Sequence, residues 1–222
     1  MKKTILLLAL FGIHCMGAQE TAKEPIFAMG PMVRVHGIYS LQFGDHYLAD
    51  ANDPQVSFGM NLSLFDVYGF RLAGGIDHLF YKTHDIEMAA DVSRTKYTAV
   101  YGAISYDIPI TEKFLIQPYV GVGWANLNFK RSDENGSSNF YADFDNVGVS
   151  SQQGAEVRVG VYFDYRLAKV VSVFTGVNYI YGSYDIDTAR EYRDYFGNSS
   201  GMQLNLGFKI GLSKRDKNKS FQ

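Results

Sequence analysis

The sequence predicts an all-β fold, a closed antiparallel eight-stranded transmembrane β-barrel that follows a cleaved signal peptide. Three observations lead to this prediction. The first residues have the composition of an export signal, period-two alternation recurs along the remaining chain, and short connections alternate with long ones. Together they favour a protein that crosses a membrane with strands and not with helices.

Residues 1–18 are predicted to be a signal peptide. Two lysines near the start precede an apolar stretch over residues 5–13, and small residues offer a cleavage site near residue 18. The apolar stretch is shorter than the roughly 20 residues that a spanning helix needs, which disfavours a membrane anchor. A lipoprotein signal at Cys15 is also disfavoured, because His14 stands where such signals have a small residue.

Removal of this segment defines the expected mature chain. We expect a short periplasmic leader over 19–26, an outer-membrane barrel over 27–213 and a basic periplasmic tail over 214–222. Loss of two lysines leaves 19 basic residues against 23 acidic ones, a formal charge of −4. No basic stripe suits nucleic acid, and the single cysteine leaves with the signal, so neither a nucleic-acid partner nor a disulfide is expected.

Each predicted strand has one apolar face and one face of small or polar residues. In the last strand, six apolar residues alternate from Met202 to Leu212, spanning about 33 Å at ~3.3 Å per residue. A tilt of roughly 40° reduces this to about 25 Å, the height of a lipid-facing band. The seven earlier apolar faces contain Val33, Val35, Tyr39, Leu41 and Phe43; Val56, Phe58, Met60, Leu62 and Leu64; Phe70, Leu72, Ile76 and Phe80; Val100, Ile104, Tyr106 and Ile108; Ile116, Val120, Val122 and Trp124; Val157, Val159, Val161 and Phe163; and Val171, Val173, Val177 and Tyr179.

The connections between these strands alternate in length. The short ones are Phe65–Gly69, Pro109–Lys113 and Arg166–Lys169, and the long polar ones are Gly44–Gln55, Lys82–Val92, Arg131–Gln152 and Gly182–Ser200. Short periplasmic turns and longer external loops are typical of membrane barrels. Both chain ends are therefore expected on the periplasmic side.

The composition of the second face predicts that the apolar face meets lipid. Glycine, alanine and serine dominate it, whereas a surface in water would carry many lysines and glutamates. Small residues suit the crowded interior of a narrow barrel. A soluble calyx that buries its apolar face is the alternative, and membrane fractionation would separate the two.

Charged residues on the inward phase predict a lumen closed by ion pairs. The predicted lumen charge network is Arg34, Arg71, Asp77, Glu156, Arg158 and Lys209, joined by Asp107 and Asp164. Four positive and four negative charges favour pairing, because an unpaired buried charge costs several kcal/mol. The last two aspartates, which lie beside short turns, could instead face periplasmic water.

Aromatic residues near the strand ends and in the last long connection predict two further features. An aromatic girdle is expected from Tyr106, Trp124, Tyr165 and Tyr179, with plain packing as the alternative. A candidate surface-binding loop contains Tyr184, Arg190, Tyr192, Arg193, Tyr195 and Phe196, because tyrosine and arginine are frequent in binding hot spots. Arg94, Lys96, Lys130 and Arg131 are expected near the outer rim, where lipopolysaccharide phosphates lie.

The segments Tyr106–Thr111 and Gln117–Trp124 resemble the central hairpin of the OmpA/OmpX-like small outer-membrane β-barrel superfamily. The resemblance implies residence in the outer membrane of a Gram-negative bacterium, and members serve as structural proteins, adhesins, factors against host defences or narrow channels. It also implies the barrel assembly machinery as a partner, normally recognising an aromatic residue of the last strand. Here a tail follows that strand, so Phe208 is the candidate assembly signal.

Enzymatic chemistry is not expected. No His-x-Ser pair occurs, and the loop carboxylates match no calcium-binding spacing, so neither a metal nor a cofactor is predicted. The leading hypothesis is an integral outer-membrane barrel with a closed polar lumen, whose surface loops serve envelope structure, surface interaction or adhesion to an extracellular ligand. The alternative is a small porin-like channel for ions or small solutes.

Overall fold

The computed structural model describes residues 31–67, 69–84, 92–131, 151–185 and 193–212. The predicted signal peptide, periplasmic leader and basic tail lie outside these described residues. Within them, strands account for nearly all regular structure, and no helix is both long and apolar enough to cross a membrane.

Eight long strands form the wall, accompanied by two short strands and two short helices among the described residues. The long strands are β1 (Met32–Gln42), β3 (Ser57–Val67), β4 (Phe70–Thr83), β5 (Val92–Tyr106), β7 (Phe114–Arg131), β8 (Ser151–Arg166), β9 (Val171–Asp185) and β10 (Asn198–Gly211). The short elements are α2 (Tyr47–Asp50), β2 (Asn52–Pro54), β6 (Ile108–Pro109) and α3 (Arg193–Gly197).

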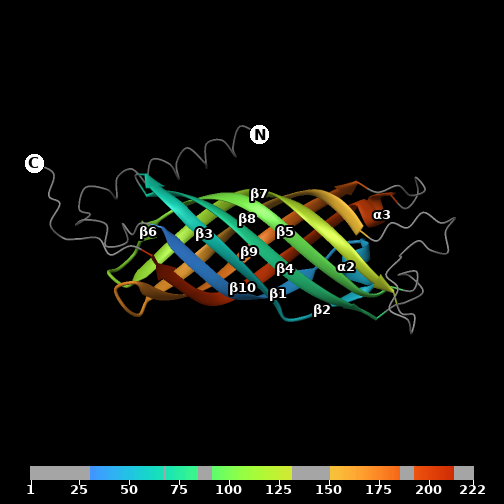
Figure 1. Cartoon of the computed structure of the whole chain (residues 1–222), viewed down its shortest axis with the longest axis horizontal. Helices are drawn as coiled ribbons and strands as arrows, with labels where there is room; N and C mark the ends of the chain where they lie inside the picture. Colours follow the sequence, from blue (N-terminus) through green and yellow to red (C-terminus); the bar gives the residue numbers. More distant parts are fainter. Residues whose placement is uncertain (1–30, 68, 85–91, 132–150, 186–192, 213–222) are drawn as a thin grey trace, which may run out of the picture.

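The long strands close into one antiparallel barrel (Figure 1). Each pairs with the next long strand along the chain, and β1 pairs with β10 over eleven positions, from Met32↔Gly211 to Gln42↔Gly201. Closure satisfies the backbone hydrogen bonds of the wall and leaves no open sheet edge, as a lipid environment requires. The predicted eight-stranded barrel is confirmed.

The two ends of the barrel differ. β6 lies at one end, while α2 and α3 lie at the other (Figure 1). At the first end β3 and β4 are joined by a tight turn in which Gly69 has φ +84°, a left-handed conformation that favours glycine. By the rule that short turns face the periplasm, α2 and α3 mark the external end.

Two predicted loops contain more regular structure than their composition suggested. The connection Gly44–Gln55 includes α2 and β2, and β2 extends the wall beside β4. β9 continues to Asp185 and β10 begins at Asn198, so the fourth long connection is shorter than predicted. The reason is cross-strand pairing, which extends to Asn198↔Ser183 although the segment looks polar.

The wall has its apolar side outside. Val35 of β1, Val122 of β7 and Leu206 of β10 are 53%, 64% and 66% exposed, and their strand neighbours point into the barrel. Burial is therefore concentrated in the lumen. This inside-out arrangement confirms which face of each strand was predicted to meet lipid. It excludes a calyx whose strands all turn their apolar face to the interior.

Candidate functional site

The lumen contains the polar chemistry of the chain, arranged in layers along the barrel axis. On β8, Asp164, Tyr162, Arg158 and Glu156 follow one another at inward positions from the periplasmic end outward. These four side chains belong to three successive layers of the lumen, because Arg158 and Glu156 share one layer. Period-two geometry sends all of them inward, and the tilt of the strands sets their heights.

The layer nearest the periplasmic end is the inner charge cluster, formed by Arg34, Arg71, Asp107, Gln117, Asp164 and Lys209. One buried carboxylate, that of Asp164, accepts from two cations. Its Oδ2 lies 2.5 Å from Lys209 Nζ and 3.2 Å from Arg34 Nη2. The three residues come from β8, β10 and β1, so the ion pairs link β8 to strands that are not its hydrogen-bonded neighbours.

The same cluster contains a second ion pair. Arg71 Nε lies 2.5 Å from Asp107 Oδ2. Gln117 joins the two pairs, because its amide donates to the other oxygen of Asp107 and its carbonyl accepts from Arg34. The side chains of both aspartates beside short turns thus lie in the lumen and not in periplasmic water, with exposed fractions of 0% for Asp164 and 8% for Asp107.

An aromatic layer separates this cluster from the next. It consists of Tyr101, Tyr119, Tyr162 and Phe174. The rings of Tyr119 and Tyr162 stack with centroids 4.7 Å apart. The Arg34 guanidinium carbon lies 4.5 Å from the Tyr162 centroid and 5.3 Å from that of Phe174, so this layer also covers the inner cations.

The next layer is the central charge cluster, formed by Asp77, Glu156 and Arg158. Arg158 donates through Nη1 to Asp77 Oδ2 at 2.7 Å and through Nε to Glu156 Oε1 at 2.8 Å. Its guanidinium carbon lies 3.5 Å from the centroid of Tyr101. One arginine therefore serves two carboxylates and stacks on a ring, a geometry that a lysine cannot reproduce.

Two more side chains complete the central charge cluster. The hydroxyl of Tyr97 donates to Glu156, and His36 Nε2 lies 3.5 Å from Asp77 Oδ1. Sequence reasoning assigned neither residue to the cluster. The available signal was the inward phase, which both share with the charged residues on neighbouring strands.

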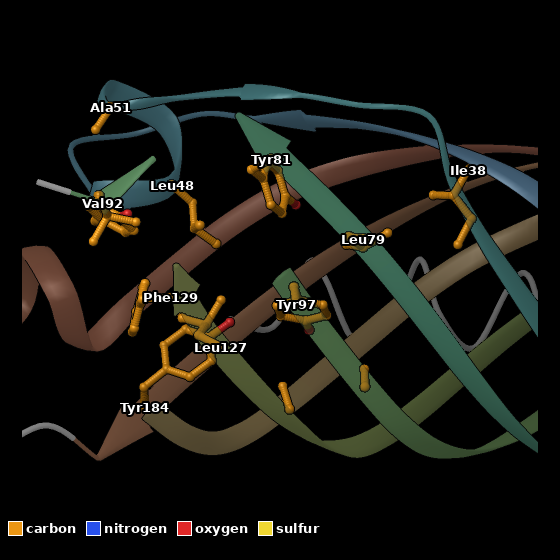
Figure 2. Packing of buried hydrophobic residues seen from close by; sticks show 13 residues of the cluster. Ile38, Leu48, Ala51, Leu79, Tyr81, Val92, Tyr97, Leu127, Phe129 and Tyr184 are labelled. Carbon is orange, nitrogen blue, oxygen red and sulfur yellow. The ribbon is translucent and has the colours of Figure 1, made fainter. Parts of the chain in front are cut away.

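The external third of the lumen is closed by an apolar cap (Figure 2). The cap contains Ile38, Tyr47, Leu48, Ala51, Leu79, Tyr81, Val92, Tyr97, Ala99, Ala125, Leu127, Phe129 and Tyr184. Helix α2 supplies Tyr47 and Leu48, which enter the barrel from the first external connection. Two tyrosines of the cap form hydrogen bonds to strand side chains. The hydroxyl oxygen of Tyr81 lies 3.1 Å from Ser40 Oγ, and that of Tyr47 lies 2.9 Å from Thr95 Oγ1.

A small cavity lies between the cap and the wall. Its volume is about 10 Å³, and Gln42, Leu48, Leu79 and Tyr97 are among its lining residues. This is close to the space of one water molecule. Across the described ranges, no group of three or more His, Cys, Asp or Glu side chains could hold a metal ion.

The six residues of the predicted lumen charge network are all buried. Their exposed fractions range from 1% to 3%, for Arg34, Arg71, Asp77, Glu156, Arg158 and Lys209. They do not form a single network, because the aromatic layer divides them into the inner and central charge clusters. The sequence pattern indicates which face a charge occupies, but it does not indicate the height at which the partner lies.

The four predicted girdle residues lie on the outer wall. Tyr106 and Tyr165 lie at the periplasmic ends of β5 and β8, where Tyr106 packs on Phe70 with centroids 4.8 Å apart. Trp124 is 56% exposed and is the last outward apolar residue of β7, since Asn126 follows at the next outward position. Tyr179 lies correspondingly on β9, two residues before Tyr181.

The prediction that Tyr184 belongs to a surface-binding loop is wrong. This residue belongs to β9, is 6% exposed and forms part of the apolar cap, where its hydroxyl lies 2.9 Å from Ser199 Oγ. Tyr195 and Phe196 of α3 are half-buried and pack against the same cap. Arg193 is exposed, whereas Arg190 and Tyr192 lie outside the described residues.

The aromatic residues of this segment turn inward for an energetic reason. Their rings cover the external mouth of a lumen that is apolar at this height, so burial removes apolar surface from water. Phe196 and Tyr47, for example, have ring centroids 5.5 Å apart. Composition alone does not separate an aromatic lid from an aromatic binding loop.

The predicted assembly signal, Phe208, lies on the outer wall. It is 56% exposed on β10, between Val35 of β1 and Val173 of β9. Its ring therefore belongs to the lipid-facing band near the seam where the first and last strands pair.

Solved bacterial outer-membrane proteins are among the structures to which this fold is similar. The fold is similar to those of Neisserial surface protein A (19% identity, covering 82% of this chain and 97% of that chain, TM-score 0.48), of Ail, the attachment invasion locus protein of Yersinia pestis (13%, 82% and 99%, 0.47), and of the outer membrane enzyme PagL (13%, 81% and 99%, 0.42). These likenesses concern the fold alone. No curated protein matches the sequence significantly.

A family model decides membership. The model of the autotransporter beta-domain matches residues 43–216, which is most of the chain. With its closed eight-stranded wall and lipid-facing apolar band, the chain has the architecture of the small OmpA/OmpX-like barrels and resides in the bacterial outer membrane. The chain is an outer-membrane β-barrel protein and belongs to the autotransporter beta-domain family.

Proposed function

We propose that this protein is a non-conducting and non-enzymatic membrane anchor, whose barrel holds an external surface for envelope structure or for interaction with an extracellular ligand. The observation that carries the proposal is the filled lumen. Two charge clusters, an aromatic layer and an apolar cap succeed one another along the axis.

Passage of an ion would require several of these layers to open. In the inner charge cluster it would compete with ion pairs as short as 2.5 Å, and in the cap it would have to displace buried tyrosine and leucine side chains. This barrier supports a static lumen and disfavours a small channel.

Planar-bilayer recording tests this part of the proposal. The refolded barrel should give no steady current, while a known porin inserted in the same bilayers supplies the positive control. Steady single-channel steps of uniform size would contradict a closed lumen and would favour the porin-like alternative for ions or small solutes.

The absence of catalysis at the membrane-spanning wall is proposed on the basis of His36 and His78, the two described histidines that lie on its strands. His36 is paired with Asp77 in the buried lumen, where lipid cannot reach it. His78 faces outward and lies 3.1 Å from Thr98 Oγ1, but among the described carboxylates none forms an ion pair with it. A catalytic base needs a group that orients it, such as a carboxylate, and the pair of His78 and Thr98 contains no carboxylate.

Mass spectrometry of lipid A tests this second part. Lipid A from cells that produce the protein should be identical to lipid A from cells without it. Loss of an acyl chain in the producing cells, abolished by His78→Ala, would contradict the proposal and would assign a lipid-modifying activity to the outer wall.

The external surface is the proposed place of interaction. Exposed residues at this end include Arg193 and Asp194 of α3, which stand above the half-buried aromatic residues of the cap. Assembly into the membrane is proposed to use the barrel assembly machinery, with Phe208 as the contacted aromatic residue. Deletion of the gene with readouts for envelope stress and adhesion would separate a structural role from an adhesive one.

A further inference from the structure

Four basic residues stand on one side of the outer wall, beyond the apolar band. They are Lys82 of β4, Arg94 and Lys96 of β5, and Lys130 of β7, and all four are exposed. Each occupies the outward phase of its strand, so its side chain leaves the wall toward the surroundings of the barrel and not toward the lumen. We call this set the basic wall.

Strand pairing brings the basic wall together. The Cα partner of Lys82 is Arg94, and the Cα partner of Arg94 is Lys130. Lys96 lies at the next outward position of β5. Because adjacent strands are ~4.8 Å apart, three of the four cations lie within about 10 Å across the wall. Residues 48 positions apart in sequence, Lys82 and Lys130, thus contribute to one patch.

Within the described part of the chain, few acidic side chains lie close to this charge. None of the four cations forms an ion pair with a described carboxylate. The nearest acid along the sheet is Asp53, the Cα partner of Lys82, whose Oδ1 lies 3.5 Å from His84 Nδ1. Four adjacent cations on a chain of formal charge −2 favour an anionic partner.

The described residues of β8 and β9 form no such patch at the corresponding height. On β8 the outward residues beyond the apolar band are Ala155 and Gln153, and on β9 they are Ser183 and Asp185. The positive charge is therefore a property of one side of the barrel. A general adaptation to water would not require this concentration.

The height of the basic wall matches the headgroup region of the external leaflet. Lys96 lies four residues beyond Val100, the last outward apolar residue of β5, which is about 10 Å above the band for a strand tilted by roughly 40°. Lys82 lies two residues beyond Phe80, about 5 Å above it by the same geometry. Long basic side chains can also bend toward the phosphates of the headgroups.

We propose that the basic wall binds the phosphate groups of lipopolysaccharide in the external leaflet. Its one-sided position would hold lipopolysaccharide against β4, β5 and β7 preferentially. This inference adds a lipid site to the anchor proposed above and does not depend on whether the lumen conducts.

A binding titration tests the proposal. The refolded barrel in a neutral detergent is titrated with bis-phosphorylated lipid A and, separately, with dephosphorylated lipid A. Native mass spectrometry counts bound lipid. The fluorescence of Trp124, the single tryptophan, reports lipid at the edge of the apolar band below the patch, because this residue is the Cα partner of Val100. We expect binding of the phosphorylated form only, weakening as salt increases.

The variant pair Arg94→Gln/Lys96→Gln should weaken this binding roughly ten-fold or more, since each cation near a charged lipid surface contributes about 1 kcal/mol. The matched control is Lys113→Gln/Lys169→Gln, which removes two exposed cations at the short-turn end and should leave binding unchanged. Heat-modifiable gel mobility verifies that both variants fold.

Three results would overturn the proposal. One is equal binding of phosphorylated and dephosphorylated lipid A. Another is equal loss in both variant pairs, which would indicate attraction by overall charge. The third is tight binding of a soluble acidic polymer, polyglutamate, without binding of lipid A, which would assign the basic wall to an acidic protein partner.

Discussion

The apolar cap and the central charge cluster fill neighbouring parts of one lumen by different means. In the cap, side chains such as Leu79 and Leu127 are buried among other apolar groups. One layer below, Arg158 is equally buried but is held by two carboxylates and a tyrosine ring. Both regions exclude water, yet only the second depends on the simultaneous presence of specific partners.

Because the two regions are held together differently, their stability should respond differently to substitution. Apolar packing is non-directional and loses free energy in proportion to the volume removed. A buried ion cluster responds to the loss of one member as a whole, because the remaining charges stay in a medium of low dielectric. Four experiments test this difference, in order of decreasing expected change in stability.

The largest effect is expected for Arg158→Met. The substitution retains much of the side-chain volume but leaves Asp77 and Glu156 buried without their cation. We expect the free energy of unfolding to fall by about 3–5 kcal/mol. Equilibrium unfolding in urea with lipid vesicles, followed by gel mobility, measures it.

The triple variant Asp77→Asn/Glu156→Gln/Arg158→Met is the control. It removes the orphaned charges and should recover most of the lost stability. A loss of only ~1 kcal/mol for Arg158→Met, as for an exposed pair, would contradict the picture of a tightly coupled cluster.

A smaller effect is expected for Leu127→Ala in the cap. Leu127 is 1% exposed, and its truncation should cost about 2–3 kcal/mol through lost burial and the cavity left behind. The matched change Leu127→Met should cost less than about 1.5 kcal/mol, because volume is conserved. The same unfolding assay measures the loss of stability in both variants. Equal losses would show that the cap, like the charge cluster, depends on one specific side chain.

The third experiment compares inward and outward glycines. An added Cβ at Gly123 would lie 2.8 Å from Tyr101 Cβ and from the Val100 carbonyl oxygen, whereas at Gly102 it would meet nothing within 4 Å. Gly123→Ala should therefore destabilise the barrel by about 1–2 kcal/mol. Gly102→Ala should be neutral or slightly stabilising, and a reversed order of unfolding midpoints would argue against the assigned faces.

The smallest effect on stability, but a visible one on assembly, is expected for Phe208→Ala. The exposed ring contributes little to the lumen, so the folded barrel should keep nearly the same unfolding midpoint. We expect less folded barrel in the outer membrane than for Phe221→Ala, measured by heat-modifiable gel shift of membrane fractions. A larger loss for Phe221→Ala would transfer the assembly signal to the tail.

Much of the fold, and less of the candidate site, could be predicted from the sequence. The alternation in β10 indicated a strand, its lipid-facing side and its inward Lys209. The partner of Lys209 was not predictable, since Asp164 lies on β8 and is brought opposite only by closure and tilt. The prediction for Tyr184 failed for a related reason. A tyrosine next to a polar loop can belong to the strand or to the loop, and only its pairing partner decides between the two.

The alternation along each strand is enough to assign its lipid-facing and lumen-facing side chains, because a period of two leaves no other choice once one face must be apolar. Only the tertiary structure decided how these side chains are grouped. It separated eight lumen charges into two clusters, placed the cap beneath α2 and assembled the basic wall from three strands. The physical reason is that contacts across and around a barrel depend on stagger and tilt, which are properties of the closed sheet and not of any single strand.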